Sequence, residues 1–170
     1  MKLIKFILLT TFLFFSNLHA DTPYFIDFKY VLNESTAGKK AQNFLKSKLD
    51  KGIKNLKAKE NKLQEEEKKI IQQKKLINAE EYKKKVKALR SEVSKLQTER
   101  QKLLNSVAKK RAKAKSELLK NVNPLIEQYM KEKNIKMVID KRSLLVANKE
   151  LDITKDITNL LNGKLKSINY

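Results

Sequence analysis

The side chains that could do chemistry in this chain are of few kinds. Cysteine is absent, and the single histidine, His19, lies in a segment that we expect to be removed. A mature chain without either residue lacks most of the usual zinc ligands and catalytic nucleophiles. Among the acids outside the long helical region, we interpret four aspartates of the body as turn, cap or strand-end residues: Asp27, Asp140, Asp152 and Asp156. The sequence therefore predicts a protein that is not an enzyme and has no catalytic, metal or cofactor site.

Gly38-Lys39 is the one pair that resembles part of a phosphate-binding loop. Such a loop needs a glycine five residues before the Gly-Lys pair and a serine or threonine directly after it. Here Asn33 and Lys40 occupy those two positions. We therefore reject a nucleotide site, and no other stretch of the chain offers one.

Basic side chains dominate the chemistry that remains. The formal charge is +20, and residues 39–133 hold 29 Lys and Arg against 12 Asp and Glu, a net charge of +17. A solvated helix face explains a balanced charge run, but an excess of this size favours binding of acidic partners. We predict two patches that bind such partners, which are Lys83, Lys84, Lys85 and Lys87, and Lys109, Lys110, Arg111, Lys113 and Lys115.

The element that carries these patches reads as an antiparallel helical hairpin, resembling a coiled coil, over residues 39–133. Its first leg places one apolar residue in each heptad: Leu49, Leu56, Leu63, Ile70 and Ile77. Its second leg is richer, with Val86, Leu89, Val93, Leu96, Leu103 and Val107 in an a/d pattern. We expect Asn78 to end the first helix and Ala79 to begin the second, with Glu80 and Glu81 in its first turn.

This reversal sets Leu49 opposite Ala108, and Leu63 opposite Val93 or Leu96. Because so few apolar side chains are available to bury, we expect the hairpin to fray toward its tip. Asn123-Pro124 then marks the joint at which the hairpin meets the body, followed by an apolar face at helical spacing: Leu125, Ile126, Tyr129 and Met130.

Residues 1–20 have the three parts of a cleaved export signal. Lys2 and Lys5 precede an apolar run from Phe6 to Phe15, and a short polar end leads to Ala20 at the expected cut. An uncleaved anchor is the alternative, but the run is shorter than the roughly 20 apolar residues that span a bilayer. A basic exported chain without cysteine fits the bacterial periplasm.

The remaining residues, 21–38 and 134–170, predict a small β body. We expect strands at 24–28, 135–139 and 144–147, and a short helix that Thr154 caps and Asn162-Gly163 ends. A body of this size is marginal alone, and its strand edges are open. It therefore predicts self-association into a shared sheet or barrel through Phe25, Ile26, Phe28, Met137, Val138, Ile139, Leu144, Leu145 and Val146.

With these segments in place, the whole mature chain resembles the Skp/OmpH family of periplasmic chaperones. The resemblance is carried by the order of short motifs around a basic hairpin behind a signal: Tyr24-Phe25-Ile26-Asp27, 31–35, 37–41, 135–140 and 151–157. It implies an α+β homotrimer in which a small intertwined β-barrel carries three helical arms around a cavity. It also implies a holdase that binds unfolded outer-membrane proteins without ATP, with lipopolysaccharide or an anionic membrane surface as a further partner.

Two other functions compete with the holdase. A nucleic-acid-binding coiled coil would explain the charge, but the signal points out of the cytoplasm and the basic legs lack aromatic stacking platforms, so we expect no nucleic-acid partner. A structural envelope protein would need an anchor or a wall-binding module, and the sequence shows neither.

Overall fold

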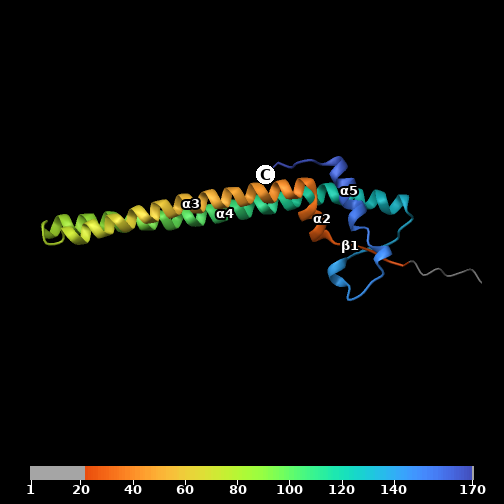
Figure 1. Ribbon diagram of the computed structural model, residues 1–170, viewed down its shortest axis with the longest axis horizontal. Coiled ribbons are helices and arrows are strands. Elements are labelled where there is room, and N and C mark those ends of the chain that lie inside the picture. The colour runs from red at the N-terminus through yellow and green to blue at the C-terminus, as the bar shows by residue number, and fades with distance from the viewer. Residues whose placement is uncertain (1–21, 170) are drawn as a thin grey trace, which may run out of the picture.

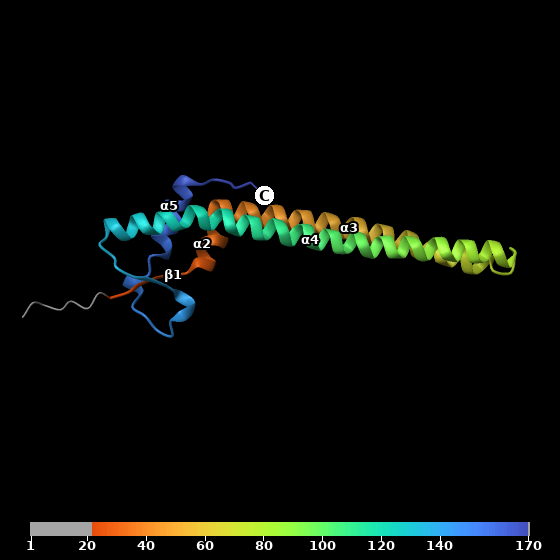
Figure 2. The ribbon, with the colours of Figure 1, turned by 180° about the vertical axis from the view of Figure 1, so that it is seen from behind.

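The computed structural model describes residues 22–169, and this part of the chain is mostly helical with one small sheet. Two long helices, α3 (Thr36–Gln73) and α4 (Ala79–Glu132), lie side by side and project from a small body (Figures 1 and 2). The body contains β1 (Tyr24–Ile26), α2 (Phe28–Glu34), β2 (Val138–Asp140), the 3₁₀ turns η2 (Lys141–Ser143) and η3 (Lys149–Leu151), and α5 (Thr154–Lys164). The predicted export signal lies outside the described residues. Within them, no helix is long and apolar enough to span a bilayer.

We call α3 and the facing part of α4 the arm, and its two helices are antiparallel as predicted. Lys59 of α3 donates to Glu99 of α4 at 2.6 Å, and Lys85 of α4 donates to Gln73 at the far end of α3 at 2.7 Å. Leu63 and Val93 line one hollow between the helices. The register inferred from the heptads is therefore confirmed.

The reversal of the chain differs in one detail from the prediction. Asn78 does not end the first helix, because α3 already ends at Gln73. Instead, the Asn78 side chain accepts a hydrogen bond from the Glu81 amide at 2.8 Å and caps α4. Asparagine is among the best residues for this position because its short side chain reaches the free amides of the first turn. Helix α4 begins at Ala79 with Glu80 and Glu81 in its first turn, as expected.

Ser35 joins α2 to α3 and caps the start of α3. Its hydroxyl accepts a hydrogen bond from the Gly38 amide at 3.2 Å, while its own amide donates to Val31 in the last turn of α2. A Cβ atom at Gly38 would lie 1.9 Å from the Leu32 backbone oxygen. Only glycine therefore lets α2 pack so tightly against the start of α3.

Helix α4 continues through Pro124 without a break and enters the body. Leu125 and Ile126 are buried there, and Tyr129 and Met130 pack against the same core, so the predicted docking face is confirmed. The core joins residues from both ends of the chain: Ile26, Val31, Val122, Leu125, Ile126, Ile135, Ile153, Ile157 and Leu161. The body thus closes around the end of α4.

The sheet pairs the first strand with one from the far end of the chain. β1 and β2 are parallel, with Tyr24 opposite Val138 and Ile26 opposite Asp140. β2 begins three residues later than the predicted strand at 135–139. Asn134 has φ 54° and ends α4 in the left-handed conformation that asparagine tolerates, after which Ile135 enters the core instead of the sheet.

The strand predicted at Leu144–Ala147 is wrong. This segment follows η2 as irregular backbone, and Leu145 is 102% exposed and Val146 92% exposed. An apolar run forms a strand only against a neighbouring edge, and none of the described segments pairs with this one. A local sequence pattern cannot reveal whether such a partner edge is present.

The last helix is present, but its ends differ from the prediction. The N-cap of α5 is Ile153, without a side-chain cap bond, and Thr154 is the first helical residue. The Thr154 hydroxyl instead accepts a hydrogen bond from the Asp27 amide at 2.8 Å. This bond links α5 to the junction between β1 and α2. The helix runs past Asn162 and Gly163 to Lys164, since neither residue adopts the left-handed conformation that ends a helix.

Candidate functional site

Asp27 and Asp140 hold local turns of the body. Asp27 caps α2 by accepting a hydrogen bond from the Tyr30 amide at 2.8 Å. Asp140 accepts hydrogen bonds from the Arg142 amide at 2.9 Å and from its guanidinium at 2.7 Å. The hydrogen bonds from the Arg142 side chain, followed by the one from its amide, lower the pKa of Asp140. A carboxyl held ionised in this way is unsuited to donate a proton near neutral pH.

Asp152 and Asp156 likewise anchor neighbouring segments. Asp152 accepts hydrogen bonds from the Thr154 amide at 3.0 Å and from Lys141 at 3.1 Å. Burial raises the pKa of Asp152, but the bonds from Thr154 and Lys141 together lower it below its ordinary value. Asp156 accepts a hydrogen bond from the Tyr129 hydroxyl at 2.7 Å, which ties α5 to α4. The geometry agrees with the interpretation of all four body acids as structural residues.

The predicted patch at Lys83, Lys84, Lys85 and Lys87 lies at the tip of the arm. Lys83 pairs with Glu80 at 3.5 Å, and Lys85 pairs with Glu81 at 3.7 Å. The other two members are exposed and have no ion-pair partner within residues 22–169: Lys84 and Lys87. Half of this patch is thus compensated by the acids that begin α4.

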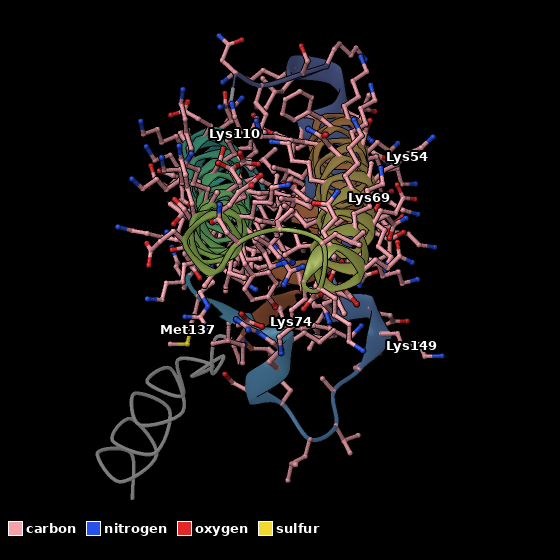
Figure 3. All side chains as sticks on the ribbon, turned by 90° about the vertical axis from the view of Figure 1, so that its left-hand side faces the viewer. Lys54, Lys69, Lys74, Lys110, Met137 and Lys149 are labelled. Atoms are coloured by element: carbon pink, nitrogen blue, oxygen red, sulfur yellow. The ribbon has the colours of Figure 1, made fainter. Side chains whose placement is uncertain are left out.

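The second predicted patch lies on α4, near the base of the arm. Lys110 rests over the Phe44 ring of α3, with its Nζ 5.6 Å from the ring centroid. Lys109, Arg111, Lys113 and Lys115 are exposed. Seen along the arm, nitrogen-bearing side chains lie around the outer sides of both helices (Figure 3). The positive charge therefore surrounds the arm rather than following one narrow line.

A groove of about 470 Å³ lies at the base of the arm, where α2, α3 and α4 meet η2. We call it the base groove. Its apolar lining comes from three helices and includes Phe28 and Leu32 of α2, Leu45 of α3, and Leu118 of α4. Ala114, which is 4% exposed, lies one helical turn from Leu118, and its small side chain leaves room between the helices. The volume falls in the range of clefts that bind ligands.

Cations from separate elements line this groove. They are Lys29 of α2, Arg111 and Lys115 of α4, and Arg142 of η2. Arg142 is paired with Asp140, which also lines the groove. The sequence pointed to Arg111 and Lys115 as members of a charge run. It gave no signal for Lys29 or Arg142, because only the fold brings α2 and η2 beside α4.

The residues predicted to mediate self-association divide into two groups. Phe25 and Ile26 are buried in the chain itself, and four others are partly buried: Phe28, Val138, Ile139 and Leu144. The remaining three are exposed apolar residues: Met137, Leu145 and Val146. In Figure 3, Met137 lies on the outer side of the body, below the arm. These three offer apolar surface that the described chain does not cover.

Comparison with known proteins places this fold in a family. The family model of OmpH-like outer membrane proteins matches residues 24–161. No curated protein matched the chain. A crystal structure from Caulobacter crescentus CB15, described as an OmpH-like candidate outer membrane chaperone, shares the fold with a TM-score of 0.79 and 20% identity. The match covers 92% of this chain and 95% of the other. The family match spans both arm helices and nearly all of the body, and the chain therefore belongs to the OmpH-like outer membrane protein family.

Proposed function

We propose that this protein is an ATP-independent holdase of the periplasm that binds unfolded outer-membrane proteins and prevents their aggregation. Family membership supports the proposal, as does the description of the similar Caulobacter protein as a candidate outer membrane chaperone. The observation that carries it is the charge of the arm. Residues 39–133 carry a net charge of +17, and they form two helices with few apolar residues to pack between them.

The physical fit is straightforward. A basic surface attracts an acidic unfolded chain over several ångströms, and exposed cations bind many sequences because they need no fixed geometry. Apolar side chains are exposed along the same helices, including Phe44 (41%), Ile53 (52%) and Leu104 (48%). An arm with both features can hold an apolar, acidic client through many weak contacts. Such binding requires neither a nucleotide nor the formation of a covalent bond.

We further propose that three copies assemble through the body, with the arms enclosing a cavity. β2 is bonded to β1 on one side only, so its other edge is open within residues 22–169. The exposed Leu145 and Val146 follow it in the chain. An open edge beside uncovered apolar residues favours pairing with another copy. Sedimentation at micromolar concentration tests this assembly, and a stable monomer would contradict it.

The function itself is tested by diluting a urea-denatured outer-membrane barrel with and without the signal-less protein. The holdase proposal expects less light scattering when the protein is present. A protein that leaves scattering unchanged but binds duplex DNA tightly would instead be the nucleic-acid-binding coiled coil. Binding to lipopolysaccharide or anionic vesicles alone would favour a role at the membrane surface.

A further inference from the structure

We propose that the base groove binds client segments in which an apolar side chain is flanked by carboxylates. This inference rests on the proposed function and deepens it, because it assigns one defined site to contacts that otherwise spread along the arm. The base groove combines an apolar lining with three cations that have no ion-pair partner among residues 22–169, namely Lys29, Arg111 and Lys115. Both features are needed to bind such a segment.

Three cations of the base groove carry charge that no ion pair compensates. Lys29, Arg111 and Lys115 are exposed and have no ion-pair partner among residues 22–169. Arg111 and Lys115 are four residues apart on α4, so their side chains are neighbours on one helix face. Like charges at this spacing repel each other and destabilise the helix. A carboxylate between them would remove that repulsion and gain two charge-assisted hydrogen bonds.

The apolar lining of the base groove is only partly covered by the chain itself. Leu45 of α3 and Leu119 of α4 line the groove and are only partly buried, as are Phe28 and Leu32 of α2. The groove has more apolar than polar surface, so a client aliphatic or aromatic side chain can enter it. A free inorganic anion would pair with the cations but would leave this apolar surface exposed to water. The lining therefore favours a segment with both kinds of group.

A second hollow, between the two helices of the arm, has a different balance of charge. The hollow around Leu63 and Val93 is lined by Glu60 and Glu67 as well as by Arg90 and Arg100. Glu60 lies 3.9 Å from Arg100, so part of its charge is already compensated within the arm. An acidic segment gains little there. The charge balance thus favours the base groove over this hollow as a site for an acidic segment.

The test measures binding of a short fluorescein-labelled peptide that alternates leucine and aspartate. Binding is measured by fluorescence anisotropy, with the full signal-less protein in its native assembly. The groove variant combines Arg111→Gln and Lys115→Gln. The control variant combines Lys54→Gln and Lys69→Gln, two exposed lysines of α3 outside the groove, and loses the same charge. A second groove variant, Arg111→Lys with Lys115→Arg, keeps both charges.

We expect the Gln groove variant to bind the peptide about tenfold more weakly, which corresponds to loss of two partly desolvated charge pairs. The control variant should change affinity less than about twofold, since distant exposed charges are screened. The charge-keeping variant should bind nearly as well as the wild type. A peptide with lysine in place of aspartate, or serine in place of leucine, should bind weakly to all four proteins.

Three results would overturn the inference. Equal losses in the groove and control variants would assign binding to the overall field of the arm. Loss of the native assembly in the groove variant, seen by sedimentation, would show that a second copy covers the groove. Binding to vesicles of anionic phospholipid that depends on Arg111 and Lys115, without a matching effect on the peptide, would assign the groove to a lipid surface.

Failure of this inference is distinguishable from failure of the proposed function. If the wild type suppresses aggregation of a denatured barrel but the groove variant binds the peptide unchanged, the holdase stands and the groove has no part in it. If the wild type does not suppress aggregation, the holdase itself is wrong, whatever the peptide does.

Discussion

Gly52 of α3 lies so close to Leu103 of α4 that a Cβ atom at position 52 would be 2.4 Å from the Leu103 Cδ2 atom. The absence of a Cβ atom at position 52 therefore leaves the space that Leu103 occupies. We predict that Gly52→Leu destabilises the arm, because overpacking costs about 1–3 kcal/mol. This outweighs the roughly 1 kcal/mol that leucine gains over glycine in a helix. Thermal unfolding followed by circular dichroism measures the change.

A double-mutant cycle provides the control for this contact. Leu103→Ala should cost less in the Gly52→Leu background than in the wild type, with a coupling of about 0.5–3 kcal/mol. Additive effects of the two substitutions would show that the helices do not meet at this point.

The ion pair between Lys59 and Glu99 crosses the arm at 2.6 Å, yet we predict that it adds little stability. Both side chains are 45% exposed, so water and salt screen the attraction. Glu99→Gln should lower the free energy of unfolding by less than about 1 kcal/mol, and salt should reduce even this difference. Urea titrations at low and high salt measure it, with Glu92→Gln, which breaks a pair within α4, as the matched control. A larger loss that persists at high salt would contradict this.

The arm should open from its tip. Near the tip, Ile71 is 58% exposed and Leu76 is 82% exposed, whereas Leu118, Val122 and Leu125 are buried where α4 enters the body. Few buried contacts mean a low free energy of local opening. We predict fast amide hydrogen exchange at residues 70–90 and slow exchange at residues 118–130. Uniform protection from exchange along the arm would show that the two helices are equally stable from base to tip, which would contradict the prediction.

Tyr129 and Asp156 should make the body sensitive to alkaline pH. The hydrogen bond to Asp156, followed by burial, raises the pKa of Tyr129 to about 12. This pKa lies above the value of about 10 in the unfolded chain. The stabilisation of the folded state by this hydrogen bond is therefore complete below pH 10 and is lost as the pH rises toward 12. Tyr129→Phe should therefore be less stable than the wild type near neutral pH, and the gap should close at high pH. Urea unfolding over a pH series measures the gap, with the exposed Tyr30→Phe as the control; a gap independent of pH would contradict the assignment.

The core around the end of α4 should be the most sensitive part of the fold. Ile157 is fully buried between α5 and its neighbours. We predict that Ile157→Ala costs about 2–5 kcal/mol through lost burial and the cavity left behind. Leu160→Ala, which truncates a side chain that is 43% exposed on the same helix, should cost much less. Equal losses in urea unfolding would mean that α5 is packed differently.

The antiparallel pairing of the arm helices could be predicted because the sequence pattern that determines it is periodic and local. The reversal expected near Asn78 placed Leu63 opposite Val93 or Leu96, and this gave the antiparallel register. Helix ends were less certain. At Asn78 the same residue type can follow one helix or begin the next, and only the observed hydrogen bond to the Glu81 amide decides between them.

The body was harder to predict because its structure depends on contacts between distant segments. Leu144–Ala147 has the composition of a strand, but strand formation needs a partner edge that a local pattern cannot reveal. The base groove was missed for a similar reason. Lys29 and Arg142 lie far from Arg111 in the sequence, and the fold alone brings them together.

The central claim is that the basic arm keeps unfolded outer-membrane proteins soluble. Its most direct test is light scattering by a urea-denatured outer-membrane barrel after dilution into increasing concentrations of the signal-less protein, at low and high salt. We predict that scattering falls to the buffer level near one trimer per barrel, and that more protein is needed at high salt because the attraction is electrostatic. Scattering that stays unchanged at a several-fold excess of protein at low salt would contradict the claim.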